Sequence, residues 1–125
     1  MSIITDNTVL VHIHSGLESK NKATLGLLVA LEAEKNDHKV TLFLAGDGVN
    51  LLSCKKAGEI VGIGTGDLYE HLENLRNSKV RIYVSGLSAK SRGHDETLLE
   101  GYNAEFAMPD VLVDESIKAD SVLCY

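Results

Sequence analysis

The fold class is indicated most directly by one segment, Lys79-Val-Arg-Ile-Tyr-Val-Ser-Gly-Leu-Ser-Ala-Lys-Ser-Arg-Gly93. In its first half the apolar residues Val80, Ile82 and Val84 alternate with other side chains, which is typical of a strand with a buried face. Its second half is polar and contains glycine, which is typical of a loop. In open α/β sheets ligands bind at the carboxyl ends of the strands, so the segment predicts a strand that leads into a functional edge.

Strands and helices are expected to alternate along the rest of the chain. The other strands are expected at 8–14 and 39–45, where apolar and β-branched residues cluster, at 121–125, and, with a weaker pattern, at 103–106. The helices are expected at 23–35, 49–54, 67–77, 95–100 and 109–119. Alternation of this kind predicts a parallel sheet with helices on both of its faces.

The glycine-rich segment 57–66 is expected to form a flexible loop that could cover the functional edge. Thr65 is expected to cap the helix that follows. The segment lacks the preceding strand and the Gly-Lys-Ser/Thr ending of a nucleotide-binding loop. A serine hydrolase is disfavoured as well, because the chain has no Gly-x-Ser-x-Gly motif.

Length and composition favour one domain over residues 1–125, since 44% hydrophobic residues are enough to build a core. The net charge of −6 disfavours nucleic acid and anionic membranes as partners. The amino terminus lacks the features of a signal peptide, and no apolar run is long enough to span a membrane. We therefore expect a cytoplasmic protein.

Polar residues follow each of the first three expected strands. Ser15 follows the first, Asp47 follows the second between two glycines, and Ser85, Ser88 and Arg92 follow the third. Parallel strands bring their carboxyl ends to one edge of the sheet, so these side chains are expected to meet there. Two questions stay open. The aspartate can instead cap the next helix, which is the more common role, and the arginine can hold either an anion or a carboxylate of a neighbouring subunit.

Two histidines, His12 and His14, lie two residues apart on the first strand and share one side of the sheet. They could bind a metal ion together with Asp47 or His94, but a hydrogen-bonded structural role is more usual for histidines on a helix-covered face. We expect no metal and no cofactor.

The two cysteines are too few for a disulfide framework or a structural zinc site, so both are expected to be reduced. Cys54 would be reactive near a helix amino terminus or near Lys55 and Lys56. Its position is closer to the end of the expected short helix, which favours an ordinary, half-buried thiol. Cys124 lies in the last strand and is expected to be inert core.

The order of several segments resembles the DsrE/DsrF-like sulfur-relay family. The matching segments are Phe43-Leu-Ala-Gly-Asp47, the glycine-rich loop before the helix at Leu68, Val84-Ser-Gly-Leu-Ser-Ala-Lys-Ser-Arg-Gly93, Met108-Pro-Asp-Val-Leu-Val113 and Ala119-Asp-Ser-Val-Leu-Cys-Tyr125. The resemblance implies a three-layer α/β/α sandwich with a five-stranded parallel sheet, and assembly into oligomers. It also implies sulfur transfer through a persulfide on a cysteine, which in one branch belongs to a Cys-x-x-Cys-x-x-x-Arg-Gly pattern after the third strand.

Both cysteine positions of that pattern hold serine in this chain, at Ser85 and Ser88, while Arg92 and Gly93 match it. A hydroxyl cannot form a persulfide and is a much weaker nucleophile than a thiol at neutral pH. The chemistry of the family therefore cannot be transferred to these positions.

The resemblance and its missing cysteines together predict a homo-oligomeric binding subunit related to intracellular sulfur transfer. Its expected contacts with a small polar or anionic ligand, or with a sulfur-relay protein, are Ser15, Asp47, Ser85, Ser88 and Arg92. Two alternatives remain: a persulfide sulfurtransferase that uses Cys54, and a structural oligomer subunit whose edge is filled by a neighbour's side chains.

Overall fold

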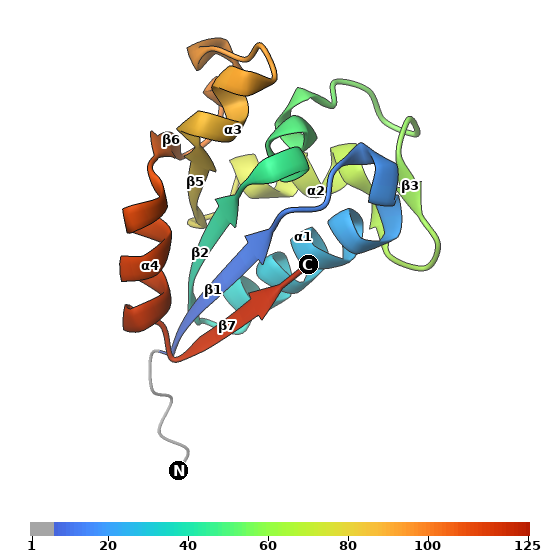
Figure 1. Ribbon diagram of the computed structural model, residues 1–125. Helices are drawn as coiled ribbons and strands as arrows, with labels where there is room; N and C mark the ends of the chain where they lie inside the picture. Colours follow the sequence, from blue (N-terminus) through green and yellow to red (C-terminus); the bar gives the residue numbers. More distant parts are fainter. Residues whose placement is uncertain (1–6) are drawn as a thin grey trace.

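The computed structural model describes residues 7–125 and is built around a five-stranded parallel sheet (Figure 1). The order of the strands across the sheet is β6-β5-β2-β1-β7. Their bounds are β1 (Thr8–Ile13), β2 (Lys39–Leu44), β5 (Arg81–Ser85), β6 (Ala104–Ala107) and β7 (Ser121–Cys124). The expected α/β architecture with five parallel strands is confirmed. Residues 1–6, which make up most of the amino-terminal segment that lacks the features of a signal peptide, lie outside the described residues.

In residues 7–125, four α-helices and three short 3-10 helices connect the strands. They are α1 (Lys20–Lys35), α2 (Leu68–Arg76), α3 (Gly86–Ser91), α4 (Pro109–Lys118), η1 (Leu17–Ser19), η2 (Gly46–Ser53) and η3 (Glu96–Leu99). α1 and α2 cover one face of the sheet and α4 lies on the other, which gives three layers (Figure 1). Within residues 7–125, no helix is both long enough and apolar enough to cross a membrane.

The two faces of the sheet are buried unequally. On β1, Val11 and Ile13 face α1 and α2 and belong to the larger core cluster, whereas Leu10 points to the opposite face. The buried members of that second cluster are Leu10, Phe43 and Ala107. α4 covers them but buries none of its own residues. The layer on this face is therefore thin.

The expectation that Cys124 is inert core is wrong, because this side chain is exposed. β7 is an edge strand that pairs with β1 alone, and all four of its residues are exposed. α4 packs against Leu10 and Phe43, toward the middle of the sheet, so its cover does not extend across β7.

Two local expectations about residues 17–66 are also wrong. The polar stretch at the start of the first helix is helical, since η1 and the first turn of α1 precede Ala23. The glycine-rich segment contains a hairpin in which β3 (Val61–Gly62) pairs antiparallel with β4 (Gly66–Asp67). Side-chain contacts tie this hairpin to α1, because Asn21 Oδ1 accepts a hydrogen bond from the Ile63 amide at 2.8 Å.

The cap of α2 is Asp67 and not Thr65. The carboxylate of Asp67 accepts a hydrogen bond from the Tyr69 amide at 2.9 Å. The Thr65 hydroxyl instead pairs with the Thr24 hydroxyl of α1 at 2.6 Å. Thr65 therefore belongs to the contact between the hairpin and α1.

Gly48 is required where the ends of β1 and β2 meet. A Cβ atom at this position would lie 2.3 Å from the backbone oxygen of Ile13. We expect Gly48→Ala to lower the free energy of unfolding by about 1–3 kcal/mol, because the backbone must shift to relieve the clash. Gly86→Ala is the matched control, since the nearest atom to its Cβ, in Phe106, lies at an ordinary 3.8 Å. Urea denaturation of both variants measures the difference, and equal stabilities would contradict the packing that we describe.

Tyr102 carries a buried hydroxyl that has no hydrogen-bond partner among the described residues, and its ring lies 4.6 Å from the guanidinium carbon of Arg76. Burial raises the pKa of this phenol, and the positive charge of Arg76 opposes the rise. As the pH rises, Tyr102 therefore loses its proton in the unfolded chain before it does in the folded chain. The stability of the folded state falls as the pH rises from 10.0, the ordinary pKa of tyrosine, through the raised pKa of Tyr102 in the folded state.

Tyr102→Phe keeps the ring over Arg76 and removes only the unpaired hydroxyl. We expect its stability near neutral pH to equal that of the wild type or to exceed it by about 1 kcal/mol. Above pH 10.0 the variant should lose less stability than the wild type. Urea denaturation at both pH values checks this. A variant that is clearly less stable near neutral pH would show that the hydroxyl is bonded.

Candidate functional site

Ser85 is the last residue of β5 and the amino-terminal cap of α3. Its hydroxyl oxygen accepts a hydrogen bond from the Ser88 amide at 3.1 Å, and the residue is only 8% exposed. The expected loop after the third strand is thus a short helix, because serine is a favourable cap. The serine at the first cysteine position of the family pattern therefore serves as a hydrogen-bond acceptor within the fold.

Ser88 connects the ends of two central strands. Its hydroxyl oxygen accepts a hydrogen bond from the Gly46 amide at 2.9 Å, so α3, which follows β5, is tied to η2, which follows β2. The sequence did not single out Gly46, because a backbone donor leaves no signature in the residue types. Ser88, at the second cysteine position of the family pattern, thus also serves as a hydrogen-bond acceptor within the fold.

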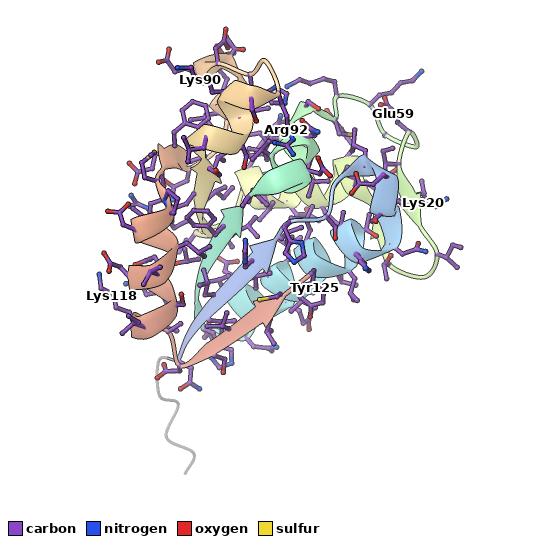
Figure 2. The ribbon with its side chains drawn as sticks, viewed as in Figure 1. Lys20, Glu59, Lys90, Arg92, Lys118 and Tyr125 are labelled. Atoms are coloured by element: carbon purple, nitrogen blue, oxygen red, sulfur yellow. The ribbon has the colours of Figure 1, made fainter. Side chains whose placement is uncertain are left out.

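Arg92 pairs with Asp47 of the same chain. Both Nε and Nη2 donate to Oδ1 of the carboxylate, at 3.2 and 2.9 Å, and Nη1 donates to Ser88 O and Ser91 Oγ, both at 3.2 Å. The side chains of Arg92 and Asp47 are 32% and 51% exposed. Figure 2 shows Arg92 between α3 and η2.

The expectation that Asp47 caps the helix after β2 is wrong. The cap of η2 is Ala45, which offers no side-chain acceptor, and the carboxylate turns instead to Arg92. The alternatives left open for Arg92 were an anion or a carboxylate from another subunit. In the structure its partner is a carboxylate from its own chain, 45 residues away in sequence.

Ser15 lies at the same edge of the sheet and is 8% exposed. Its neighbour Gly16 makes the closest approach to Asp47, because a Cβ atom at position 16 would lie 2.5 Å from the backbone oxygen of Asp47. The edge therefore brings together segments that follow β1, β2 and β5, as expected from parallel strands. We refer to Asp47, Ser85, Ser88 and Arg92, with Ser15 beside them, as the edge cluster.

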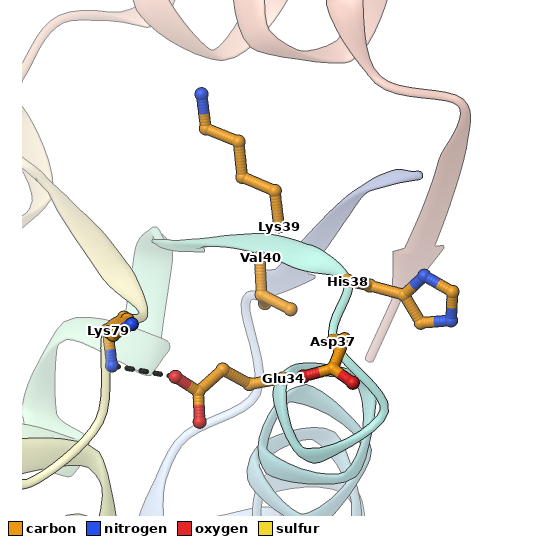
Figure 3. A pocket seen from close by; sticks show the side chains of 6 residues that line it. All are labelled: Glu34, Asp37, His38, Lys39, Val40 and Lys79. Carbon is orange, nitrogen blue, oxygen red and sulfur yellow. Dashed lines mark hydrogen bonds between the residues drawn. The ribbon is translucent and has the colours of Figure 1, made fainter. Parts of the chain in front are cut away.

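Within residues 7–125, the five cavities that we identified are lined by other residues. A cavity of about 480 Å³ lies at the opposite end of the strands, between the end of α1 and the starts of β2 and β5 (Figure 3). There the Glu34 carboxylate accepts a hydrogen bond from the Lys79 amide at 2.8 Å, while the side chain of Lys39 extends away (Figure 3). The edge cluster is held together by contacts between its own members.

Cys54 follows η2 and is 3% exposed. Its thiol lies 3.8 Å from the backbone oxygen of Lys56, which accepts the weak S–H bond. A buried thiol at the carboxyl end of a helical segment lacks the features that activate cysteine. A sulfur donor could reach it only after this segment opens.

The metal site considered for the histidines does not form with the residues first suggested. The rings of His12 and His14 lie 5.5 Å apart, but Asp47 is bound to Arg92, and His94 Nε2 is bound to Asn50 Oδ1 at 2.7 Å. The pKa of His12 is lowered, first by burial and then by the nearby His14. No group of three or more His, Cys, Asp or Glu side chains in the described part of the chain is arranged to hold a metal ion.

Two solved structures share the fold. The ychN protein from E. coli superposes with a TM-score of 0.72 at 19% sequence identity, covering 97% of this chain and 100% of that one. MTH1491 from Methanobacterium thermoautotrophicum, a protein of unknown function, superposes with a TM-score of 0.64 at 17% identity, covering 96% of this chain and 100% of its own. At these identities the likeness concerns the fold alone.

The sequence comparison identifies the family. No functionally curated protein matches the sequence. The model of the DsrE/DsrF-like family matches residues 7–125, nearly the whole chain, and agrees with the resemblance read from its motifs. The chain therefore belongs to the DsrE/DsrF-like family.

Proposed function

We propose that this protein is a non-catalytic binding subunit related to intracellular sulfur transfer, and that its edge cluster receives an anion or a carboxylate of a partner. The observation that carries the proposal concerns Ser85 and Ser88, the serines at the two cysteine positions of the family pattern. Ser85 caps α3 and Ser88 accepts from Gly46, so each hydroxyl is an acceptor within the fold. Neither hydroxyl can carry sulfur as a persulfide.

The guanidinium of Arg92 is the group that would bind the anion or the partner's carboxylate. A guanidinium has five N–H donors, and four hydrogen bonds hold it in the structure, so its binding capacity is nearly filled by the chain itself. A half-exposed ion pair contributes only about 0–1 kcal/mol, however. An incoming anion can therefore displace Asp47 from Arg92 at small cost.

Self-association and a cytoplasmic location are further parts of the proposal. The outer side of α4 carries Val113 and Ile117, one turn apart, at 55% and 79% exposed, and Met108 precedes the helix at 51%. These apolar side chains support an interface with another copy. The two free cysteines support a reducing compartment such as the cytoplasm.

Anion binding is tested by titrating the protein with inorganic thiosulfate and, separately, sulfate, while following backbone amide shifts by NMR. We expect weak binding near Arg92 in the wild type, tighter binding by up to about fivefold in Asp47→Asn, and loss of binding in Arg92→Gln. Asp47→Asn frees the guanidinium, whereas Arg92→Gln removes it.

Glu105→Gln is the matched control, because Glu105 forms a similarly exposed ion pair with Arg81 away from the edge cluster. This variant should bind both anions as the wild type does. Equal affinities in the wild type, Asp47→Asn and Arg92→Gln would show that the edge cluster is not an anion site. That result would favour a structural role for this edge.

Sulfur acceptance separates the proposal from catalysis at Cys54. In a Cys124→Ser background, the protein is incubated with a persulfide donor and analysed by intact mass and peptide mapping. We expect no added sulfur on Cys54, because the thiol is buried. Sulfur found on Cys54 under native conditions would establish the sulfurtransferase alternative instead.

A further inference from the structure

A second group of reactive side chains lies outside the edge cluster, where β7 pairs with β1. Cys124 is the Cα partner of His12 in the parallel pairing of these strands. Residues paired in this way point to the same face, and the ring of His14, which directly follows β1, lies beside that of His12 with centroids 5.5 Å apart. One thiol and two imidazoles therefore share one patch of the sheet.

The backbone holds this patch in place. The Tyr125 amide donates to His12 O at 2.8 Å, and the His14 amide donates to Tyr125 O at 2.9 Å, so both backbone groups of Tyr125, the residue after Cys124, are bonded to residues 12–14. Neighbouring strands are about 4.8 Å apart, so the thiol and the His12 imidazole can reach a common ion by side-chain rotation alone. The strands themselves need not move.

The patch is also open to solvent. Cys124 and His14 are exposed, because α4 covers Leu10 and Phe43 but not β7. The inner side of the patch is dry, since the His12 ring packs against Phe43 with ring centroids 5.9 Å apart. An ion can thus enter from one side and meet an apolar wall on the other.

His12 Nε2 is buried, and none of residues 7–125 makes a hydrogen bond with it. Such a nitrogen costs free energy unless something binds it, so its presence calls for a partner. A metal ion held between the imidazole and the thiol would supply one.

We propose that Cys124 and His12, with His14 beside them, form a binding site for a soft monovalent metal ion of the Cu(I) class. Thiolate and imidazole are ligands that Cu(I) accepts. A linear Cu(I) ion needs one thiolate and one imidazole, so the site does not require a ready-made group of three ligands. On binding, the thiol releases its proton to solvent and a sulfur–copper bond forms, with no change in oxidation state.

The proposal is tested by anaerobic titration of the whole protein with Cu(I) in the presence of a colorimetric Cu(I) chelator. We expect the wild type to remove one equivalent of Cu(I) from the chelator. Cys124→Ser should lose this binding. Cys54→Ala, the matched cysteine control, should retain it, because Cys54 is buried elsewhere in the core.

The contribution of the imidazoles is tested with His14→Ala and with the double variant His12→Leu/His14→Leu, both of which keep the thiol. We expect the double variant to bind Cu(I) at least tenfold more weakly than the wild type. Circular dichroism checks its fold, and imidazole nitrogen shifts in the wild type give an independent readout. Wild-type affinity in Cys124→Ser, wild-type affinity in a folded double variant, or imidazole shifts unmoved by Cu(I) would each overturn the proposal.

Discussion

The hydrogen bond from the Gly46 amide to the Ser88 hydroxyl ties together the segments that follow β2 and β5, and the edge cluster depends on it. Without this bond, the ion pair of Arg92 with Asp47 would be the remaining polar link that we describe between the end of α3 and the start of η2. Arg92, at the end of α3, reaches Asp47 only because the two segments are held at this separation. The cap at Ser85 sets the direction of α3 in the same way.

The loss of the motif cysteines and the geometry of the edge have one physical explanation. A hydroxyl is a good hydrogen-bond acceptor, whereas a thiol is a weak one. Serine at positions 85 and 88 therefore gives a firm cap and a firm link between strands, and it removes the nucleophile that a persulfide requires. The same two serines that cannot form a persulfide therefore hold this edge in a fixed geometry.

The fold could be predicted largely from the sequence, because period-two strands such as Val80–Val84 and a proline at the start of α4 are local signals. The sequence predicts which residues gather at the edge cluster, because they follow parallel strands, but it does not predict the contacts between them. The pairing of Asp47 with Arg92 joins residues 45 positions apart, and no local pattern distinguishes that pairing from a helix cap. The helix α3 is too short to show helical periodicity.

The exposure of Cys124 could not be predicted for a different reason. Its strand has the apolar composition of a core strand, and only the order of the strands reveals that it lies at an edge. Once that order is known, the pairing of Cys124 with His12 follows directly from the register. Apolar composition therefore does not tell whether a strand lies in the middle or at the edge of a sheet.

Hydrogen exchange at the Gly46 amide tests the central claim most directly, because this donor has a side-chain oxygen as its partner. The account predicts that the Gly46 amide is protected in the wild type and loses its protection in Ser88→Ala. The nearby Gly48 amide, which donates to Ala45 O at 2.9 Å, should stay protected in both proteins. A Gly46 amide that exchanges in the wild type as fast as an unprotected amide would contradict the account.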